Sequence, residues 1–77
     1  MGSLTVHVLD KNNHAVQGKR VVCYYRFFIR GERDSDHDGI ARFENVPVGP
    51  VGVFIEGRER LAIEVGDTHE DATVRLS

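Results

Sequence analysis

Apolar and polar residues alternate along most of this 77-residue chain, and this period of two limits its fold more than any other feature. The alternation is clearest in residues 4–8, 51–55, 61–65 and 72–76. Successive side chains of a β-strand point to opposite faces of a sheet, so these segments are expected to be strands with one buried face. No helical apolar period extends beyond about two turns. The pattern therefore predicts an all-β fold.

Turn-forming residues divide the chain into seven expected strands. Asp38-Gly39 is a strong hairpin signal because glycine accepts the positive φ of a tight turn, and Arg30-Gly31-Glu32 is expected to end the second strand. The expected strands are residues 3–9, 19–29, 33–36, 40–45, 51–56, 60–65 and 71–77. Short strands with frequent turns predict a single domain over residues 1–77, an antiparallel Greek-key β-sandwich. Its expected inward residues are Leu4, Val6, Val8, Phe43, Val53, Ile63 and Val74.

Charge and cysteine content argue against several classes of function. Ten Lys and Arg are spread along the chain against twelve Asp and Glu, so the basic surface of a nucleic-acid-binding protein is not expected. Cys23 is the only cysteine, which rules out an intramolecular disulfide and a cysteine-based zinc site. We expect Cys23 to be a core residue and the protein to need no cofactor.

The sequence does not indicate where the protein resides. No apolar run is long enough to span a membrane, and the first residues lack the basic and then apolar pattern of a secretory signal. Membrane insertion is therefore not expected. The chain is compatible with a fragment of a larger exported or secretion-associated protein.

Four short segments resemble carboxypeptidase regulatory-like domains. Residues 4–10, Leu-Thr-Val-His-Val-Leu-Asp, and residues 15–18, Ala-Val-Gln-Gly, resemble the first strand of the family and the step into the second. Residues 35–43, Ser-Asp-His-Asp-Gly-Ile-Ala-Arg-Phe, and residues 44–49, Glu-Asn-Val-Pro-Val-Gly, resemble its central hairpin and the step that follows. The resemblance implies a transthyretin-like (prealbumin-like) β-sandwich with an immunoglobulin-like appearance. Because relatives serve as accessory domains, stalks and adaptors, it does not fix a function.

The acidic segment 34–39, Asp-Ser-Asp-His-Asp-Gly, is the sharpest local feature. Carboxylates at alternate positions before a glycine, here Asp34, Asp36 and Asp38, are typical of loops that bind calcium. The EF-hand pattern is not matched, because the twelfth position is Asn45 and the flanking segments are expected strands. In the resembled family this segment shapes a hairpin. We therefore expect a structural turn, with a weak calcium- or carbohydrate-binding module as an alternative.

Catalysis has little support in the sequence. The serines lie outside any Gly-Xaa-Ser-Xaa-Gly elbow, and a small sandwich is not expected to enclose a water-excluding pocket. An isopeptide crosslink is not expected either, because the inward positions of the first and last strands are apolar. The four histidines lack metal-site spacing and are expected at the surface: His7, His14, His37 and His69. We predict that the protein is not an enzyme.

The second strand carries the best candidate for a binding surface. Its expected outward face mixes aromatic and basic residues, joined by one residue of the fifth strand: Val22, Tyr24, Arg26, Phe28 and Phe54. Tyr, Phe and Arg are the residue types enriched in the cores of protein interfaces. The leading hypothesis is a non-catalytic accessory or adaptor module that binds a protein partner or a neighbouring domain. The alternative is a structural spacer or stalk, and exposed apolar strands would also favour self-association.

Overall fold

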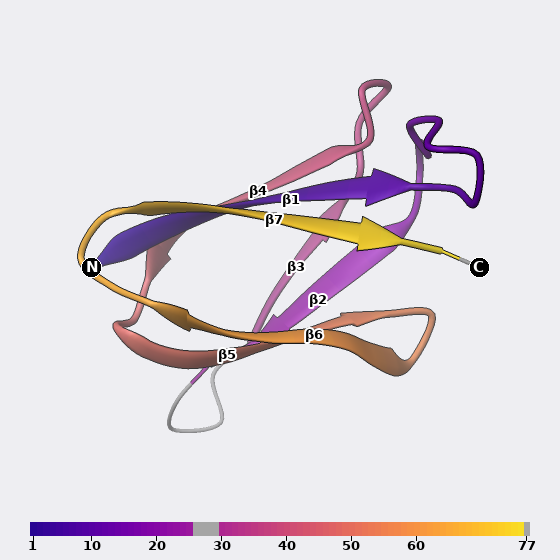
Figure 1. Cartoon of the computed structure of the whole chain (residues 1–77). Coiled ribbons are helices and arrows are strands. Elements are labelled where there is room, and N and C mark those ends of the chain that lie inside the picture. Colours follow the sequence, from indigo (N-terminus) through magenta and orange to yellow (C-terminus); the bar gives the residue numbers. More distant parts are fainter. Residues whose placement is uncertain (26–29, 77) are drawn as a thin grey trace.

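The computed structural model describes residues 1–25 and 30–76, which form two β-sheets packed face to face (Figure 1). The strands are β1 (Gly2–Leu9), β2 (Arg20–Tyr24), β3 (Arg30–Asp34), β4 (Ile40–Val46), β5 (Gly49–Ile55), β6 (Arg58–Val65) and β7 (His69–Arg75). One sheet has the strand order β4-β1-β7, and the other has the order β3-β2-β5-β6. The predicted all-β sandwich is confirmed. The described residues contain no helix with the length and apolar character needed to cross a membrane.

The first and last strands are parallel neighbours, which corrects the expectation of an entirely antiparallel fold. β1 pairs with β7 from Ser3 opposite His69 to Leu9 opposite Arg75, whereas the other strand pairs are antiparallel. Parallel neighbours cannot be joined by a tight hairpin and need a long connection, which the intervening strands supply here. As a result, the start of β1 and the end of β7 lie at opposite ends of the molecule (Figure 1).

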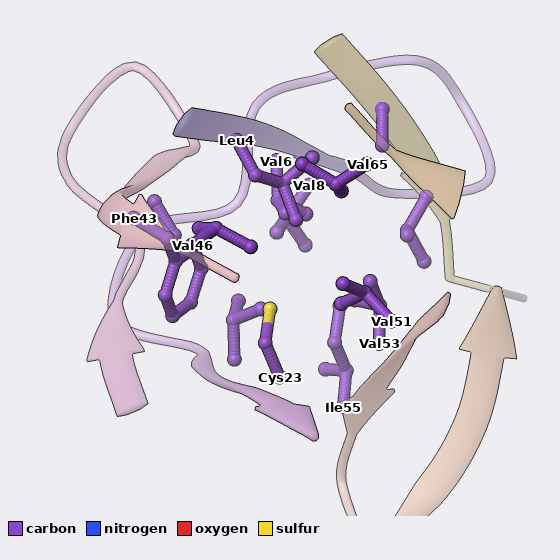
Figure 2. Packing of buried hydrophobic residues seen from close by; sticks show 14 residues of the cluster. Leu4, Val6, Val8, Cys23, Phe43, Val46, Val51, Val53, Ile55 and Val65 are labelled. Carbon is purple, nitrogen blue, oxygen red and sulfur yellow. The ribbon is translucent and has the colours of Figure 1, made fainter. Parts of the chain in front are cut away.

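The core lies between the two sheets and is built from the inward residues of the alternating segments (Figure 2). Fully buried side chains of β1 face those of β2 and β5, and Phe43 closes one side of the cluster. The predicted inward residues are confirmed, although Ile63 is only half-buried at the edge of the core. The inward positions of β1 and β7 are apolar, as expected. Each buried Val, Leu or Ile stabilises the fold by about 1.5–3 kcal/mol relative to exposure.

The second strand is shorter than predicted. β2 ends at Tyr24, whereas the alternation predicted a strand over residues 19–29. Two of the predicted surface residues, Arg26 and Phe28, lie outside the described residues. Tyr25 is half-buried and packs against the core, on the inward side that the alternation predicted.

The segment Arg30-Gly31-Glu32 belongs to β3 and not to a turn, which corrects the prediction that β3 begins at residue 33. Gly31 pairs with Cys23 of β2. A Cβ atom at Gly31 would lie 2.7 Å from the hydroxyl oxygen of Tyr25. Glycine is therefore needed here because a side chain approaches the strand closely, and the same residue type misled the prediction of a turn.

Candidate functional site

Three of the predicted binding residues lie together on the outer face of the β3-β2-β5-β6 sheet. Val22 of β2 is directly opposite Phe54 of β5, and Tyr24 is the next outward residue of β2. The rings of Tyr24 and Phe54 meet edge to face, with centroids 5.0 Å apart and an angle of 76° between their planes. This is a favourable arrangement for two aromatic rings, because the positive edge of one meets the negative face of the other.

Gly52 explains why the two rings meet. It is directly opposite Tyr24 and presents no side chain on the outer face. A Cβ atom at Gly52 would lie 3.2 Å from Cε1 of Phe54, so the Phe54 ring covers the glycine backbone. Phe54 is half-buried as a result, whereas Tyr24 stays 43% exposed. The aromatic pair is thus held by its own sheet and still offers a ring to solvent.

A charged network borders the aromatic pair on the β3 side. Arg20 contacts Asp34 with Nε 3.3 Å from Oδ1, and its Nη1 lies 3.7 Å from Oε2 of Glu32. Arg30 Nη2 lies 3.1 Å from Oε1 of Glu32. A hydrogen bond to the Tyr24 hydroxyl, followed by the charge of Glu32, raises the pKa of Arg30. Arginines and carboxylates are therefore balanced on this side of the pair.

A shallow hollow of about 370 Å³ lies beside the pair. Its lining combines the rings with charged side chains and the β5–β6 hairpin: Arg20, Val22, Tyr24, Phe54, Glu56 and Gly57. An apolar floor with a few polar groups at the rim is typical of a surface that receives side chains of a partner.

The predicted acidic segment does not act as one unit. Asp34 ends β3 and contacts Arg20, away from the turn. Asp36 shapes the turn itself, since its Oδ1 accepts the backbone N–H groups of Asp38 at 2.9 Å and Ile40 at 3.0 Å. These hydrogen bonds are the main cause that lowers the pKa of Asp36. Gly39 has a φ of +74°, as the hairpin signal predicted.

The loop after β1 forms a turn of the same geometry as the one at Asp36, although it contains fewer acidic residues. Oδ1 of Asp10 accepts the backbone N–H groups of Asn12 at 2.8 Å and His14 at 2.9 Å, and Asn13 takes the positive φ that Gly39 takes in the other loop. The two loops lie at the same end of the molecule (Figure 1). The recurrence indicates that an aspartate in this position serves to form the turn.

The side chains of the acidic turn fit calcium poorly. Among the described residues, the group with three ligand atoms within 4.8 Å of one another is Asp36, His37 and Asp38, without Asp34. Calcium takes about six to eight oxygen ligands, and a histidine nitrogen is not among those it prefers. One oxygen of Asp36 already accepts two backbone hydrogen bonds. The geometry therefore favours the structural role of the turn.

The outer face of the β4-β1-β7 sheet holds a polar cluster that the sequence analysis missed. Ser3 Oγ lies 2.7 Å from Nδ1 of His69, and Thr5 Oγ1 lies 3.2 Å from its Nε2. Asp71 Oδ1 lies 3.3 Å from the same Nε2 and 3.7 Å from Nε2 of His7. The parallel pairing of β1 with β7 brings these residues together. The one sequence signal is that each segment carries polar residues at alternate positions.

This cluster contains Ser, His and Asp but lacks the arrangement of a catalytic triad. His69 and Asp71 are both exposed, so the carboxylate is not held in a site that excludes water. Asp71 and Thr5 share the same ring nitrogen, Nε2, while Ser3 meets Nδ1. A nucleophile would need an enclosed site with donors for the developing oxyanion. The four histidines lie at the surface, as predicted, and His7 and His69 are placed here by the tertiary structure.

Cys23 lies in the core, as predicted. Its side chain is fully buried, and burial raises the pKa of the thiol to about 12. Cysteine reactivity depends on the thiolate, so this residue has a packing role in the native state.

Comparisons with known proteins show the fold. No protein-family model matches the chain, and no curated protein does. Similar solved structures include the TIE protein of Bacillus anthracis, with a TM-score of 0.77 and 23% identity over 97% of this chain. The major pilin subunit BcpA of Bacillus cereus is similar in two structures, with TM-scores of 0.77 and 0.71 and identities of 14% and 15% over 97% and 99% of this chain. This chain spans 16% of the TIE protein and 29–30% of the pilin subunits. At these identities the likeness shows a shared β-sandwich.

Proposed function

We propose that this domain is a non-catalytic interaction module of a larger protein or assembly, which docks a protein partner or a neighbouring domain. The observation that carries the proposal is the Tyr24–Phe54 pair on the outer face of the β3-β2-β5-β6 sheet. The pair lies outside the core, and Tyr24 stays 43% exposed. Interface hot spots are enriched in such aromatic residues, which bury a large area at low cost in conformational entropy.

We also assign the sandwich to the transthyretin-like, carboxypeptidase regulatory-like type. The supporting evidence is the position of the resembling motifs in the fold. Residues 35–39 form the hairpin between β3 and β4, and residues 44–49 cover the end of β4 and the step into β5. The TIE protein and the BcpA pilin subunit are much longer than this chain, which supports a domain that works inside a larger assembly.

A structural spacer is the second candidate, and one observation favours it. Because β1 and β7 are parallel, Gly2 and Arg75 lie at opposite ends of a molecule that extends 33 × 22 × 16 Å. A domain of this shape can separate two neighbouring domains attached at its ends without binding a partner through its faces. The spacer reading predicts that the aromatic pair is irrelevant to binding.

The experiment compares wild type with Tyr24→Ala and Thr73→Ala in calorimetric titrations against the domains encoded beside this chain in its gene. Thr73 is exposed on the other sheet and serves as the matched control. We expect Tyr24→Ala to weaken binding roughly 30-fold, as a hot-spot residue does. Its stability loss should stay below about 1.5 kcal/mol because the ring is only partly buried. Sedimentation at several concentrations tests self-association through the same face.

Two results would contradict the proposal. Equal binding by wild type and Tyr24→Ala would favour the spacer. A loss of several kcal/mol of stability in Tyr24→Ala would instead assign the ring to the core.

A separate measurement tests the acidic turn. A rise in melting temperature on adding calcium, reversed by a chelator, would favour the metal-binding alternative there, since a ligand that binds only the native state stabilises it.

A further inference from the structure

A second hollow, of about 420 Å³, lies on the opposite side of Tyr24, toward the edge strand β6. Tyr24 forms one wall, and the small outward residues Gly52 and Ala62, which pair across β5 and β6, form the floor. Glu59 and Glu64 of β6 stand at its rim. Tyr24 therefore separates this acidic hollow from the arginine-containing hollow beside Val22.

A β-bulge brings Glu59 to this face. Val53 pairs with Leu61, but the next residue, Phe54, pairs with Glu59, so Arg60 is the extra residue of β6. Arg60 donates from Nε to the backbone carbonyl oxygen of Ile55 at 3.2 Å and from Nη2 to Oε1 of Glu56 at 3.3 Å. A bulge changes which side chains share a face. Without it, strict alternation would put Glu59 and Glu64 on opposite faces of β6.

The carboxylate of Glu59 leans over the floor of the hollow. Its Oε1 would lie 3.8 Å from a Cβ atom at Gly52, which is the same position that the Phe54 ring covers. The Glu59 carboxylate thus lies beside the rings of Tyr24 and Phe54 and above the backbone of Gly52. A cation bound over the face of the Tyr24 ring would meet this carboxylate at the same time.

Among the described residues, no basic side chain pairs with the carboxylates of this side of the sheet. Within residues 1–25 and 30–76, neither Glu59 nor Glu64 forms an ion pair with a basic side chain. On the β3 side of Tyr24, by contrast, Arg20 and Arg30 are paired with Glu32 and Asp34. Within the described part of the chain, this side therefore carries an excess of negative charge, which is complementary to a positive charge.

We infer that this hollow receives a basic side chain, Lys or Arg, of the protein partner. The methylene stem would lie on Tyr24 and on the floor formed by Gly52 and Ala62, and the charged head would lie between Glu59 and Glu64. Long basic side chains bury an apolar stem while their charge stays near water and carboxylates. The inference rests on the proposed function, which it makes more specific by naming the chemistry of the residue that docks.

The test uses the whole 77-residue chain, labelled with ¹⁵N, and a capped Gly-Gly-Lys-Gly-Gly peptide as the probe. The same peptide with norleucine in place of Lys keeps the stem and removes the charge. We expect the Lys peptide to shift the amide signals of Gly52, Glu59 and Ala62, and the norleucine peptide to bind several-fold more weakly. Glu59→Gln and Glu64→Gln should each weaken binding of the Lys peptide roughly two- to fivefold, as for an exposed ion pair.

Glu44→Gln is the matched control, because Glu44 is exposed on the outer face of the other sheet and its substitution changes the net charge equally. Tyr24→Leu keeps apolar bulk without a π-face and should weaken binding roughly threefold or more, whereas Tyr24→Phe should retain it. The ¹⁵N spectrum of each variant reports whether it is folded. Equal binding of the two peptides, or an equal loss in Glu44→Gln and Glu59→Gln, would overturn the inference.

Failure here can be told apart from failure of the proposed function. If partner binding is lost in Tyr24→Ala but unchanged in Glu59→Gln and Glu64→Gln, the aromatic pair docks a partner without a basic residue. If Tyr24→Ala also binds like wild type, both proposals are wrong.

Discussion

Ser35 connects two segments of the fold, a role that its position in a polar segment of the sequence does not reveal. It is buried, its Oγ donates to the backbone carbonyl oxygen of Val16 at 2.6 Å, and it accepts the backbone N–H of Lys19 at 3.0 Å. Backbone bonds between the same segments join Ser35 to Gly18 and Lys19. One hydroxyl thus ties the loop before β2 to the end of β3.

We expect Ser35→Ala to lower the free energy of unfolding by about 1–3 kcal/mol, because it leaves the part-buried N–H of Lys19 and the part-buried carbonyl oxygen of Val16 without their partner. Chemical denaturation with wild type and with Thr73→Ala as an exposed control measures the effect. A loss no larger than that of Thr73→Ala would show that water replaces the hydroxyl.

Asp10 and Asp36 make stability depend on pH. Backbone hydrogen bonds favour the ionised carboxylate and lower the pKa of both from the ordinary value of 3.8. Their contribution is therefore complete above the unfolded-state pKa and is lost as the pH falls through the folded-state pKa. A hydrogen bond from Lys19, followed by its charge, lowers the pKa of Glu56, and a hydrogen bond from the N-terminal amino group, followed by its charge, lowers the pKa of Asp67.

We expect the melting temperature to change little down to about pH 5 and to fall below about pH 4. The double variant Asp10→Asn/Asp36→Asn keeps an oxygen acceptor in each turn but cannot titrate there, so its decline should be smaller. Scanning calorimetry from acid to neutral pH compares the two. If the melting temperatures of wild type and the double variant fall in parallel with pH, groups other than Asp10 and Asp36 cause the acid sensitivity.

At the scale of elements, the loops at one end of the sandwich pack on each other. Gly39 of the β3–β4 hairpin lies against β1 and the loop that follows it. A Cβ atom at Gly39 would lie 2.7 Å from the carbonyl oxygen of Val8 and 3.1 Å from Cβ of Ala15. The hairpin glycine therefore satisfies two demands at once, a positive φ and a close approach between segments.

Gly18 allows the two demands to be separated. Its φ is +80°, close to that of Gly39, but a Cβ atom there would meet nothing within 4 Å. We expect Gly18→Ala to cost about 1 kcal/mol from backbone strain alone and Gly39→Ala to cost clearly more, because the contact with β1 must also open. Thermal unfolding of the two variants measures this difference, and equal losses would mean that the loops separate freely.

At the scale of the whole molecule, the sandwich has one core and two outer faces of different character. The face of the β3-β2-β5-β6 sheet carries aromatic rings between charged flanks, whereas the face of the β4-β1-β7 sheet carries hydroxyls, imidazoles and carboxylates. Cys23 of β2 points its sulfur into the buried cluster between the two sheets (Figure 2). Its thiol therefore reports on separation of the sheets.

We expect a thiol reagent to label Cys23 in the native protein only through global unfolding. Burial keeps the side chain inaccessible and protonated, with a pKa of about 12. The labelling rate should then rise in Ser35→Ala and Gly39→Ala in proportion to the stability each loses. Fast labelling at the same rate in wild type and in both variants would show that β2 opens locally.

The sequence by itself determined that the chain forms strands and which side chains they bury, although not the exact bounds of β2 and β3. Alternation is a property of one strand, so it identified the inward residues Leu4 and Val53 and the outward Tyr24 without knowledge of any neighbour. The turn at Asp36 was equally predictable, because the side chain bonds to backbone only two and four residues away. Local hydrogen bonds and local periodicity are encoded locally.

Only the tertiary structure decided which strands lie side by side, and with that the composition of each outer face. The parallel pairing of β1 with β7 joins Ser3 to His69 across 66 positions of sequence. The bulge at Arg60 places Glu59 beside Tyr24. Gly31 lies inside a strand because the Tyr25 hydroxyl leaves no room for a side chain there. Register and partner choice depend on how two sheets bury their apolar faces together, which no single segment specifies.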